Sequence, residues 1–198
     1  MTLIRKNLQC RPCRITTAFL LGVVLTITAT EVRGQVSSPA KSSSVSDQRT
    51  DLAGIYHSAV SPAEEAARNA AIEKAIGGMS VFIRSTARSR ISATTRILAT
   101  YAISFEQGKI VVRAEGRPEM ISGDQGEPVD YNYNGKRSKL SQKLVSGRIV
   151  QTFASDEGSR QNEFTLSQDG QLLTLKVTLT SPRLSAPVVY SLSYKKVD

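Results

Sequence analysis

The chain has 198 residues, of which 40% are apolar and 6% aromatic, and a formal net charge of +9. This length suits one domain with appendages, and the apolar fraction excludes a wholly disordered chain. With only two cysteines and one histidine, a zinc site of the Cys/His kind cannot be assembled. No metal or other cofactor is therefore expected.

Residues 1–34 predict a secretory signal peptide. Four basic residues and no acid precede an apolar run from Ile15 to Ile27, and small residues follow it. The run is shorter than the roughly 20 apolar residues that cross a bilayer, although an uncleaved signal anchor is the alternative. We expect export after cleavage, to the periplasm or out of the cell.

Cleavage after residue 34 would change the cysteine content and the net charge of the mature chain. It removes Cys10 and Cys13, whose C-x-x-C spacing we interpret as incidental, and it lowers the net charge to +5. No nucleic-acid partner is expected at that charge. Residues 35–50 are rich in serine and predict a disordered linker, so the folded domain should occupy residues 51–198.

The domain should open with a short strand and two helices. After the strand at 53–58, Ser61 can cap a helix that starts at Pro62, with Glu64 closing a capping box. This helix should end at Ile76, before two glycines. A second helix is predicted from about Met79 to Arg90, which completes a helical hairpin.

The remainder of the chain predicts consecutive β-hairpins. Glycines at 135, 147, 158 and 170 recur every 11 or 12 residues, and apolar and polar residues alternate between them. With the opening strand, the pattern gives ten strands, of which 118–122 is the weakest. The other predicted strands are 99–106, 109–115, 127–133, 136–145, 148–155, 159–167, 171–180 and 187–196.

The predicted fold is mainly β. A long meander would leave exposed edges unless it closed on itself. We therefore expect an antiparallel up-and-down β-barrel of about 8–10 strands, with the two-helix hairpin inserted after the first strand.

The order of elements over residues 51–197 is similar to that of the calycin group, and of fatty-acid-binding proteins within it. The opening Leu52-Ala-Gly54-Ile-Tyr56 resembles a loose version of the lipocalin opening. Fatty-acid-binding proteins commonly hold the ligand carboxylate with an Arg-x-Tyr in the last strand, where this chain has Leu192-Ser193-Tyr194. The resemblance implies a barrel with an interior but carries over no carboxylate-binding residue.

Five residues on inward-facing positions are candidates for ligand binding. Arg160 or Gln142 could meet a polar head group, while apolar neighbours bury the rest of a small molecule. The alternative places Arg160 at the barrel rim with its head in water, and Gln142 in a bond to neighbouring backbone. The five candidates are Gln142, Arg160, Asn162, Tyr190 and Tyr194.

The second helix carries a basic face. Arg84 and Arg88 lie one turn apart and could contact anionic lipid head groups in a transient membrane-surface contact. The alternative is an ordinary solvated helix face.

No motif for catalysis is present, so no catalytic residue is assigned. His57 is the single histidine, and the sequence has no G-x-S-x-G, H-E-x-x-H or Gly-rich phosphate loop. We expect an exported, non-catalytic protein that binds a small apolar or amphipathic ligand inside the barrel. The alternative is a protein- or envelope-interaction domain whose barrel is filled by its own side chains. An enzyme acting through Arg160 or a tyrosine is a remoter third hypothesis.

Overall fold

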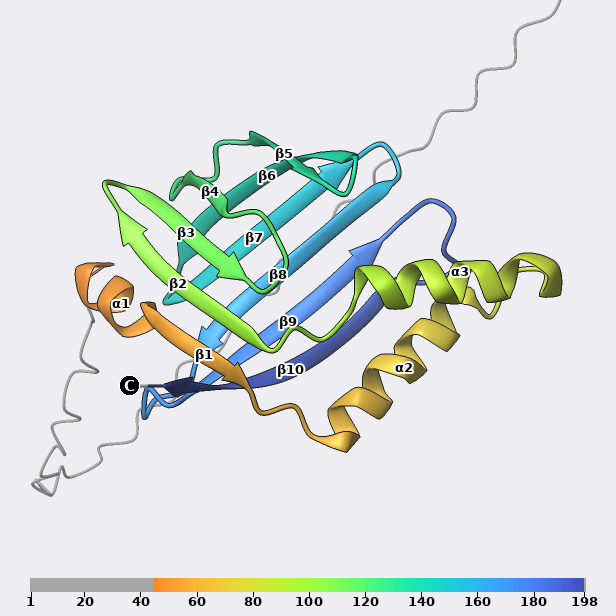
Figure 1. Ribbon diagram of the computed structural model, residues 1–198, viewed down its shortest axis with the longest axis horizontal. Coiled ribbons are helices and arrows are strands. Elements are labelled where there is room, and N and C mark those ends of the chain that lie inside the picture. The colour runs from red at the N-terminus through yellow and green to blue at the C-terminus, as the bar shows by residue number, and fades with distance from the viewer. Residues whose placement is uncertain (1–44, 198) are drawn as a thin grey trace, which may run out of the picture. The chain divides into compact units, whose positions relative to one another are not determined.

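The computed structural model describes the backbone of residues 45–197 and the side chains from residue 49 (Figure 1). Three helices and ten strands follow one another in this part of the chain. The helices are α1 (Val45–Leu52), α2 (Pro62–Ile76) and α3 (Val81–Thr94). The strands are β1 (Gly54–Ser58), β2 (Thr100–Glu106), β3 (Lys109–Ala114), β4 (Met120–Gly123), β5 (Val129–Tyr133), β6 (Lys136–Val145), β7 (Arg148–Ser155), β8 (Gly158–Leu166), β9 (Leu172–Thr180) and β10 (Val188–Val197).

The strands form one antiparallel sheet in the order β4-β3-β2-β1-β10-β9-β8-β7-β6-β5. The sheet curls into a nearly closed barrel, because β4 and β6 approach each other across the seam. A single bridge between Gln125, which follows β4, and Lys143 of β6 joins the two sides of the seam, together with a backbone hydrogen bond of 3.3 Å from Leu144 N to Asp124 O. The predicted ten-strand meander is confirmed, including its weakest strand, and so is the barrel.

The helical hairpin also forms as predicted. Ser61 and Glu64 close a capping box at the start of α2, which has the predicted bounds. Helix α3 continues to Thr94, beyond the predicted end at Arg90. Helix α2 lies along β10, to which Glu64 is tied by a hydrogen bond of 2.7 Å from Ser193 Oγ.

Helix α1 lies at the end of the barrel opposite the hairpin (Figure 1). It begins inside the stretch predicted as a linker, and the predicted signal peptide and the rest of that linker lie outside the described residues. Arg49 forms an ion pair with Asp124 beside the seam, and Tyr56 Oη donates a hydrogen bond of 2.8 Å to Leu52 O. Because Leu52 is itself buried, α1 closes this end of the barrel.

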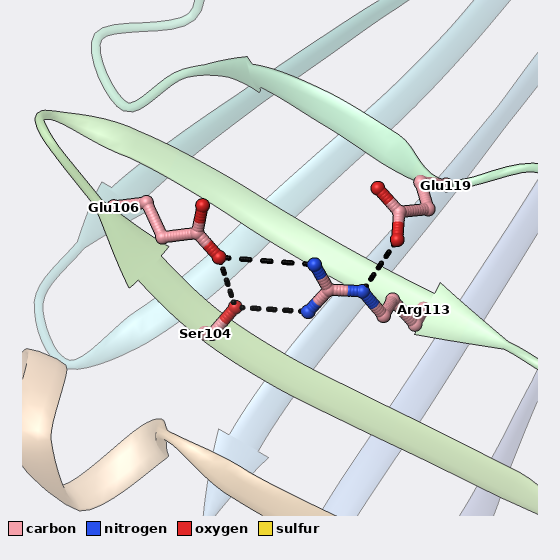
Figure 2. Close-up of polar contacts among 4 residues, drawn as sticks. All are labelled: Ser104, Glu106, Arg113 and Glu119. Atoms are coloured by element: carbon pink, nitrogen blue, oxygen red, sulfur yellow. Dashed lines mark hydrogen bonds and ion pairs between the residues drawn. The ribbon is translucent and has the colours of Figure 1, made fainter.

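The edge strand β4 is tied to its neighbours on the outer face of the sheet. Figure 2 shows Arg113 of β3 between Glu119, which precedes β4, and two residues of β2. The Arg113 guanidinium donates a bond of 2.6 Å to Glu119, a weak bond of 3.4 Å to Ser104, and lies 3.8 Å from Glu106. These contacts connect β2 and β3 to the residue that precedes β4, next to the last main-chain pair of β3 and β4, Val112 with Met120.

The core fills the half of the barrel nearer α1. Tyr101 lies edge-on to Phe164 and to Tyr194, with ring centroids 5.5 and 5.1 Å apart. Aliphatic residues that are almost fully buried surround these rings, among them Ile110, Ile149, Leu173, Leu175 and Leu192. Among residues 45–197, no helix is long and apolar enough to cross a membrane.

Candidate ligand-binding cavity

The other half of the barrel is open. A cavity of about 1100 Å³ lies between α3 and the adjoining ends of β5 to β9. Volumes of about 300–1000 Å³ are typical of small-molecule sites, so this cavity is large enough for a ligand with a long apolar part. The apolar side chains that line it are Met79, Ile83, Ala87, Ile91, Ala93, Tyr131, Tyr133, Phe153, Leu179 and Leu184.

The same cavity is strongly basic. Its only acidic lining residue is Glu157, which lies 3.7 Å from Lys136. The other basic lining residues are Arg90, Arg117, Arg137, Arg160 and Arg183. Within the described part of the chain, none of these five arginines forms an ion pair.

A buried ladder of polar side chains crosses three strands just below the cavity. Gln142 of β6, Gln151 of β7 and Asn162 of β8 are paired in register. Asn162 Nδ2 donates to Gln151 Oε1, and Gln151 Nε2 donates to Gln142 Oε1, both at 2.8 Å. Gln142 Nε2 then donates to Ile110 O at 2.8 Å and Met120 O at 3.2 Å. Every donor points the same way along the ladder, an arrangement in which hydrogen bonds strengthen one another.

Arg160 joins this ladder to helix α3. Its Nε donates to Asn162 Oδ1 at 2.9 Å and its Nη1 donates to Thr94 O at 2.7 Å. From helix α2, Arg68 Nε donates a hydrogen bond of 2.9 Å to Thr95 O. Two buried guanidinium groups thus face the C-terminal carbonyls of α3, where the helix dipole favours positive charge.

Three of the five predicted ligand-binding residues come together in this ladder. Arg160 is only 9% exposed, so it does not lie at the rim with its head in water, and it is the one predicted residue that lines the cavity. Gln142 does bond to backbone, although on the opposite edge of the seam. Asn162 bonds to side chains on both sides.

The two predicted tyrosines lie away from the cavity lining. Tyr190 Oη reaches Thr95 O at 3.5 Å, beneath the end of α3. Tyr194 packs in the filled half of the barrel against Tyr101. Burial raises the pKa of both phenols further above its ordinary value of 10.0.

Sequence reasoning missed two residues that the geometry makes prominent. Gln151 is fully buried at the centre of the ladder, and its alternation with Ile149 and Phe153 was a usable signal for an inward-facing polar residue. Arg117 lies in the loop between β3 and β4, with Cζ 5.0 Å from the centre of the Tyr133 ring. No periodic pattern marks a loop residue of this kind.

Arg117 and Arg160 approach the same part of the interior. Burial raises the pKa of Tyr101 and of Tyr131, and the positive charges of both arginines oppose that rise at each tyrosine. Arg117 Nε is buried and has no hydrogen-bond partner. The two guanidinium groups therefore place positive charge that has no acidic partner among the described residues near Tyr131 at the cavity wall.

The two arginines that were predicted to contact a membrane, Arg84 and Arg88, both form their side-chain bonds within the helical hairpin. Arg84 Nη2 donates to Gly77 O at 3.0 Å and Met79 O at 2.9 Å. Arg88 forms a bidentate ion pair with Glu73 of α2, at 2.5 and 2.7 Å.

No cluster of metal-ligating side chains occurs among residues whose side chains are described.

Comparisons with known proteins concern the fold. No protein-family model matches the chain, and no curated protein matches it. In its order of elements and strands, the chain is a nearly closed, antiparallel up-and-down β-barrel with a helix pair after the first strand. The order of elements from which the resemblance was predicted is therefore present in the structure.

Solved structures with similar folds are distant in sequence. A secretory abundant heat soluble protein from Ramazzottius varieornatus is 12% identical, with a TM-score of 0.49 over 74% of this chain and 96% of that one. The fluorescent protein UnaG is 20% identical, with a TM-score of 0.48 over 75% and 98%. A Schistosoma mansoni fatty-acid-binding protein, solved with arachidonic acid, is 14% identical, with a TM-score of 0.46 over 76% and 99%.

Proposed function

We propose that this chain is an exported, non-catalytic binding protein that holds a small amphipathic molecule in the cavity beneath α3. The cavity carries the proposal, because it joins an apolar wall to a cluster of basic groups in an otherwise packed barrel. The filled half of the barrel supplies rigidity, and the open half supplies volume. Export rests on the N-terminal signal-peptide pattern.

A single tryptophan in the cavity would report binding directly. The chain has no tryptophan, and Thr86 is an exposed residue of α3 that lines the cavity. In Thr86→Trp, we expect laurate or dodecyl phosphate to produce a saturable blue shift in fluorescence, with a Kd below about 100 µM. A ligand tail that replaces water around the indole is the physical cause.

Ala70→Trp is the matched control, because Ala70 is exposed on α2 and does not line the cavity. Its emission should stay constant over the same titrations. Equal shifts in both variants would indicate nonspecific adsorption of the detergent-like probes. No saturable shift with either probe would contradict the proposed binding function.

The start of α3 favours a second role, contact with a lipid surface while ligand enters or leaves. Val81, Phe82 and Ile83 are 77%, 93% and 55% exposed, which is unusual for consecutive large apolar residues. The exposed Arg90 lies further along the same helix, and the first turn of α3 contains no acid. An apolar tip followed by basic residues suits an anionic bilayer.

Phe82→Ser tests this contact. We expect it to reduce co-sedimentation with vesicles of phosphatidylglycerol and phosphatidylcholine at least about fivefold, because a phenyl ring supplies most of the apolar area that could enter the interface. Phe153→Leu, inside the cavity, is the control and should sediment as the parent chain does. Equal sedimentation of the parent chain and Phe82→Ser would exclude the tip as a membrane contact.

A further inference from the structure

The unpaired charge at the cavity wall indicates what kind of head group the ligand carries. Arg160 is 9% exposed and Arg117 is partly buried, and neither has an acidic partner in the described part of the chain. Buried charges in proteins are nearly always paired. A counter-charge is therefore the missing component of this site.

The helix dipole accounts for only part of the positive charge. The C-terminus of α3 is equivalent to about half an elementary negative charge, whereas Arg68 and Arg160 bring two full positive charges to its carbonyls. Arg117 adds a third nearby, with its Nε lacking any partner. The excess is well above one charge.

A carboxylate head would bring one negative charge and occupy one guanidinium fork. A phosphate monoester brings between about 1.5 and 2 negative charges and three acceptor oxygens, which can be shared between two guanidinium groups. Further arginines without acidic partners, Arg90, Arg137 and Arg183, line the same cavity. Both the number of charges and the number of donors thus favour the phosphate.

We infer that the cavity takes an amphipathic phosphate monoester, with its phosphate between Arg117 and Arg160 and its apolar tail along Phe153, Leu179 and Ile91 of the cavity wall. This inference rests on the proposed binding function and specifies its ligand class. It places the head group beside the barrel mouth, on residues from the β3–β4 loop and from β8.

Ligands with matched tails separate the head-group preference from binding itself. Dodecyl phosphate, laurate and dodecanol are titrated into the purified full chain by calorimetry, with glycerol 3-phosphate as a phosphate without a tail. We expect dodecyl phosphate to bind at least about tenfold more tightly than laurate, and laurate more tightly than dodecanol. Glycerol 3-phosphate should bind at least about a hundredfold more weakly than dodecyl phosphate, because it cannot use the apolar wall.

Arg117→Gln should lower the affinity for dodecyl phosphate about tenfold while changing that for dodecanol less than twofold. Arg160→Gln should act in the same direction, and its fold is checked by circular dichroism because Arg160 also bonds to Thr94 and Asn162. The control is Arg113→Gln on the outer face of the sheet, which should bind all probes as the parent chain does.

Each contrary outcome has a distinct meaning. Equal affinities for dodecyl phosphate, laurate and dodecanol would overturn the phosphate preference and leave the binding function standing. Glycerol 3-phosphate binding as tightly as dodecyl phosphate would overturn the amphipathic ligand class. Failure of all three tailed probes would overturn the proposed function as well. Unchanged affinity for dodecyl phosphate in both arginine variants would exclude these two residues as its head-group site.

Discussion

Alkaline unfolding of this protein is expected to be unusually steep, beginning near pH 10. Five of its six tyrosines have a pKa raised by burial: Tyr56, Tyr101, Tyr131, Tyr190 and Tyr194. For Tyr56 the pKa rises from 10.0 to about 12. In the unfolded chain these phenols lose their protons near pH 10, whereas in the native barrel they keep them.

The direction of the effect follows from proton linkage. Between pH 10 and about 12 the unfolded state binds fewer protons than the native state, so the free energy of unfolding falls as pH rises. Each buried phenol that keeps its proton after the unfolded chain has lost it contributes a slope of up to about 1.4 kcal/mol per pH unit, and the slopes of such phenols add. Since domains of this size are stable by only about 5–15 kcal/mol, we expect the barrel to unfold as the pH rises above 10.

Urea unfolding followed by circular dichroism from pH 8 to 11.5 measures this slope, and tyrosinate absorbance should rise together with unfolding. Tyr194→Phe and Tyr56→Phe each remove one titrating phenol, so each should make the free energy of unfolding fall less steeply with pH. The two variants should differ in their free energy of unfolding at pH 7. Tyr56 donates a hydrogen bond to Leu52 O, whose loss costs about 1 kcal/mol. Tyr194 Oη is buried without a hydrogen bond of normal geometry, so its loss should cost little. Tyrosinate absorbance that rises near pH 10 while the fold persists would contradict the prediction.

The architecture of the described domain could be read from the sequence because each element carries a local signal. The capping box at Ser61 and Glu64 set the start of α2, and its bounds were predicted without error. Turns at evenly spaced glycines separated the strands, and positive φ values at Gly135, Gly147 and Gly170 show why glycine is needed there. Consecutive hairpins leave little choice of strand order.

The extent of barrel filling could not be read from the sequence, because it depends on the barrel radius and on where the helices lie. One end of the barrel interior is filled by side chains, and the other end is open. Side chains such as Tyr101 and Phe164 fill the end near α1, and the cavity occupies the end near α3. Alternation alone identifies which residues point inward but not which end of the barrel they occupy.

The hydrogen-bond partners of the inward-facing polar residues could not be predicted from the sequence either. Gln142 bonds to residues 22 and 32 positions away in the chain, and Arg160 to one 66 positions away. Such pairs arise only when the sheet curls and the helix end is laid over its mouth. The sequence could propose Arg160 as an interior residue, but its position between the ladder and α3 is a tertiary property.

The polar ladder closes the barrel where main-chain pairing fails. Between β4 and β5 the sheet has no ladder of backbone hydrogen bonds, so the seam depends on contacts made from inside. Gln142 supplies two of them, because its Nε2 donates to carbonyls of β3 and β4 while its Oε1 accepts from Gln151. Arg160 connects the other end of the ladder to α3 and the cavity.

Gln142→Met is therefore expected to lower the free energy of unfolding by about 3 kcal/mol or more. Methionine keeps the size and shape of glutamine but removes its hydrogen bonds to Ile110 O, Met120 O and Gln151 Nε2, of which Gln151 Nε2 keeps a weak bond of 3.7 Å to Met120 Sδ. Each buried group left unpaired costs about 1–3 kcal/mol. Urea denaturation at pH 7 measures the loss. Hydrogen exchange should also be faster at the amides of β3 and β4, since the seam loses its internal ties.

Gln161→Met is the matched control, because Gln161 lies on the outer face of β8 and its side chain hydrogen-bonds to the neighbouring Glu163 and not across the seam. That substitution should change stability by less than about 0.5 kcal/mol. Similar losses in the two variants would contradict a specific role of Gln142 in holding the seam. A large loss confined to Gln142→Met, with faster exchange at β4, would show that the polar ladder beneath the cavity holds the barrel closed.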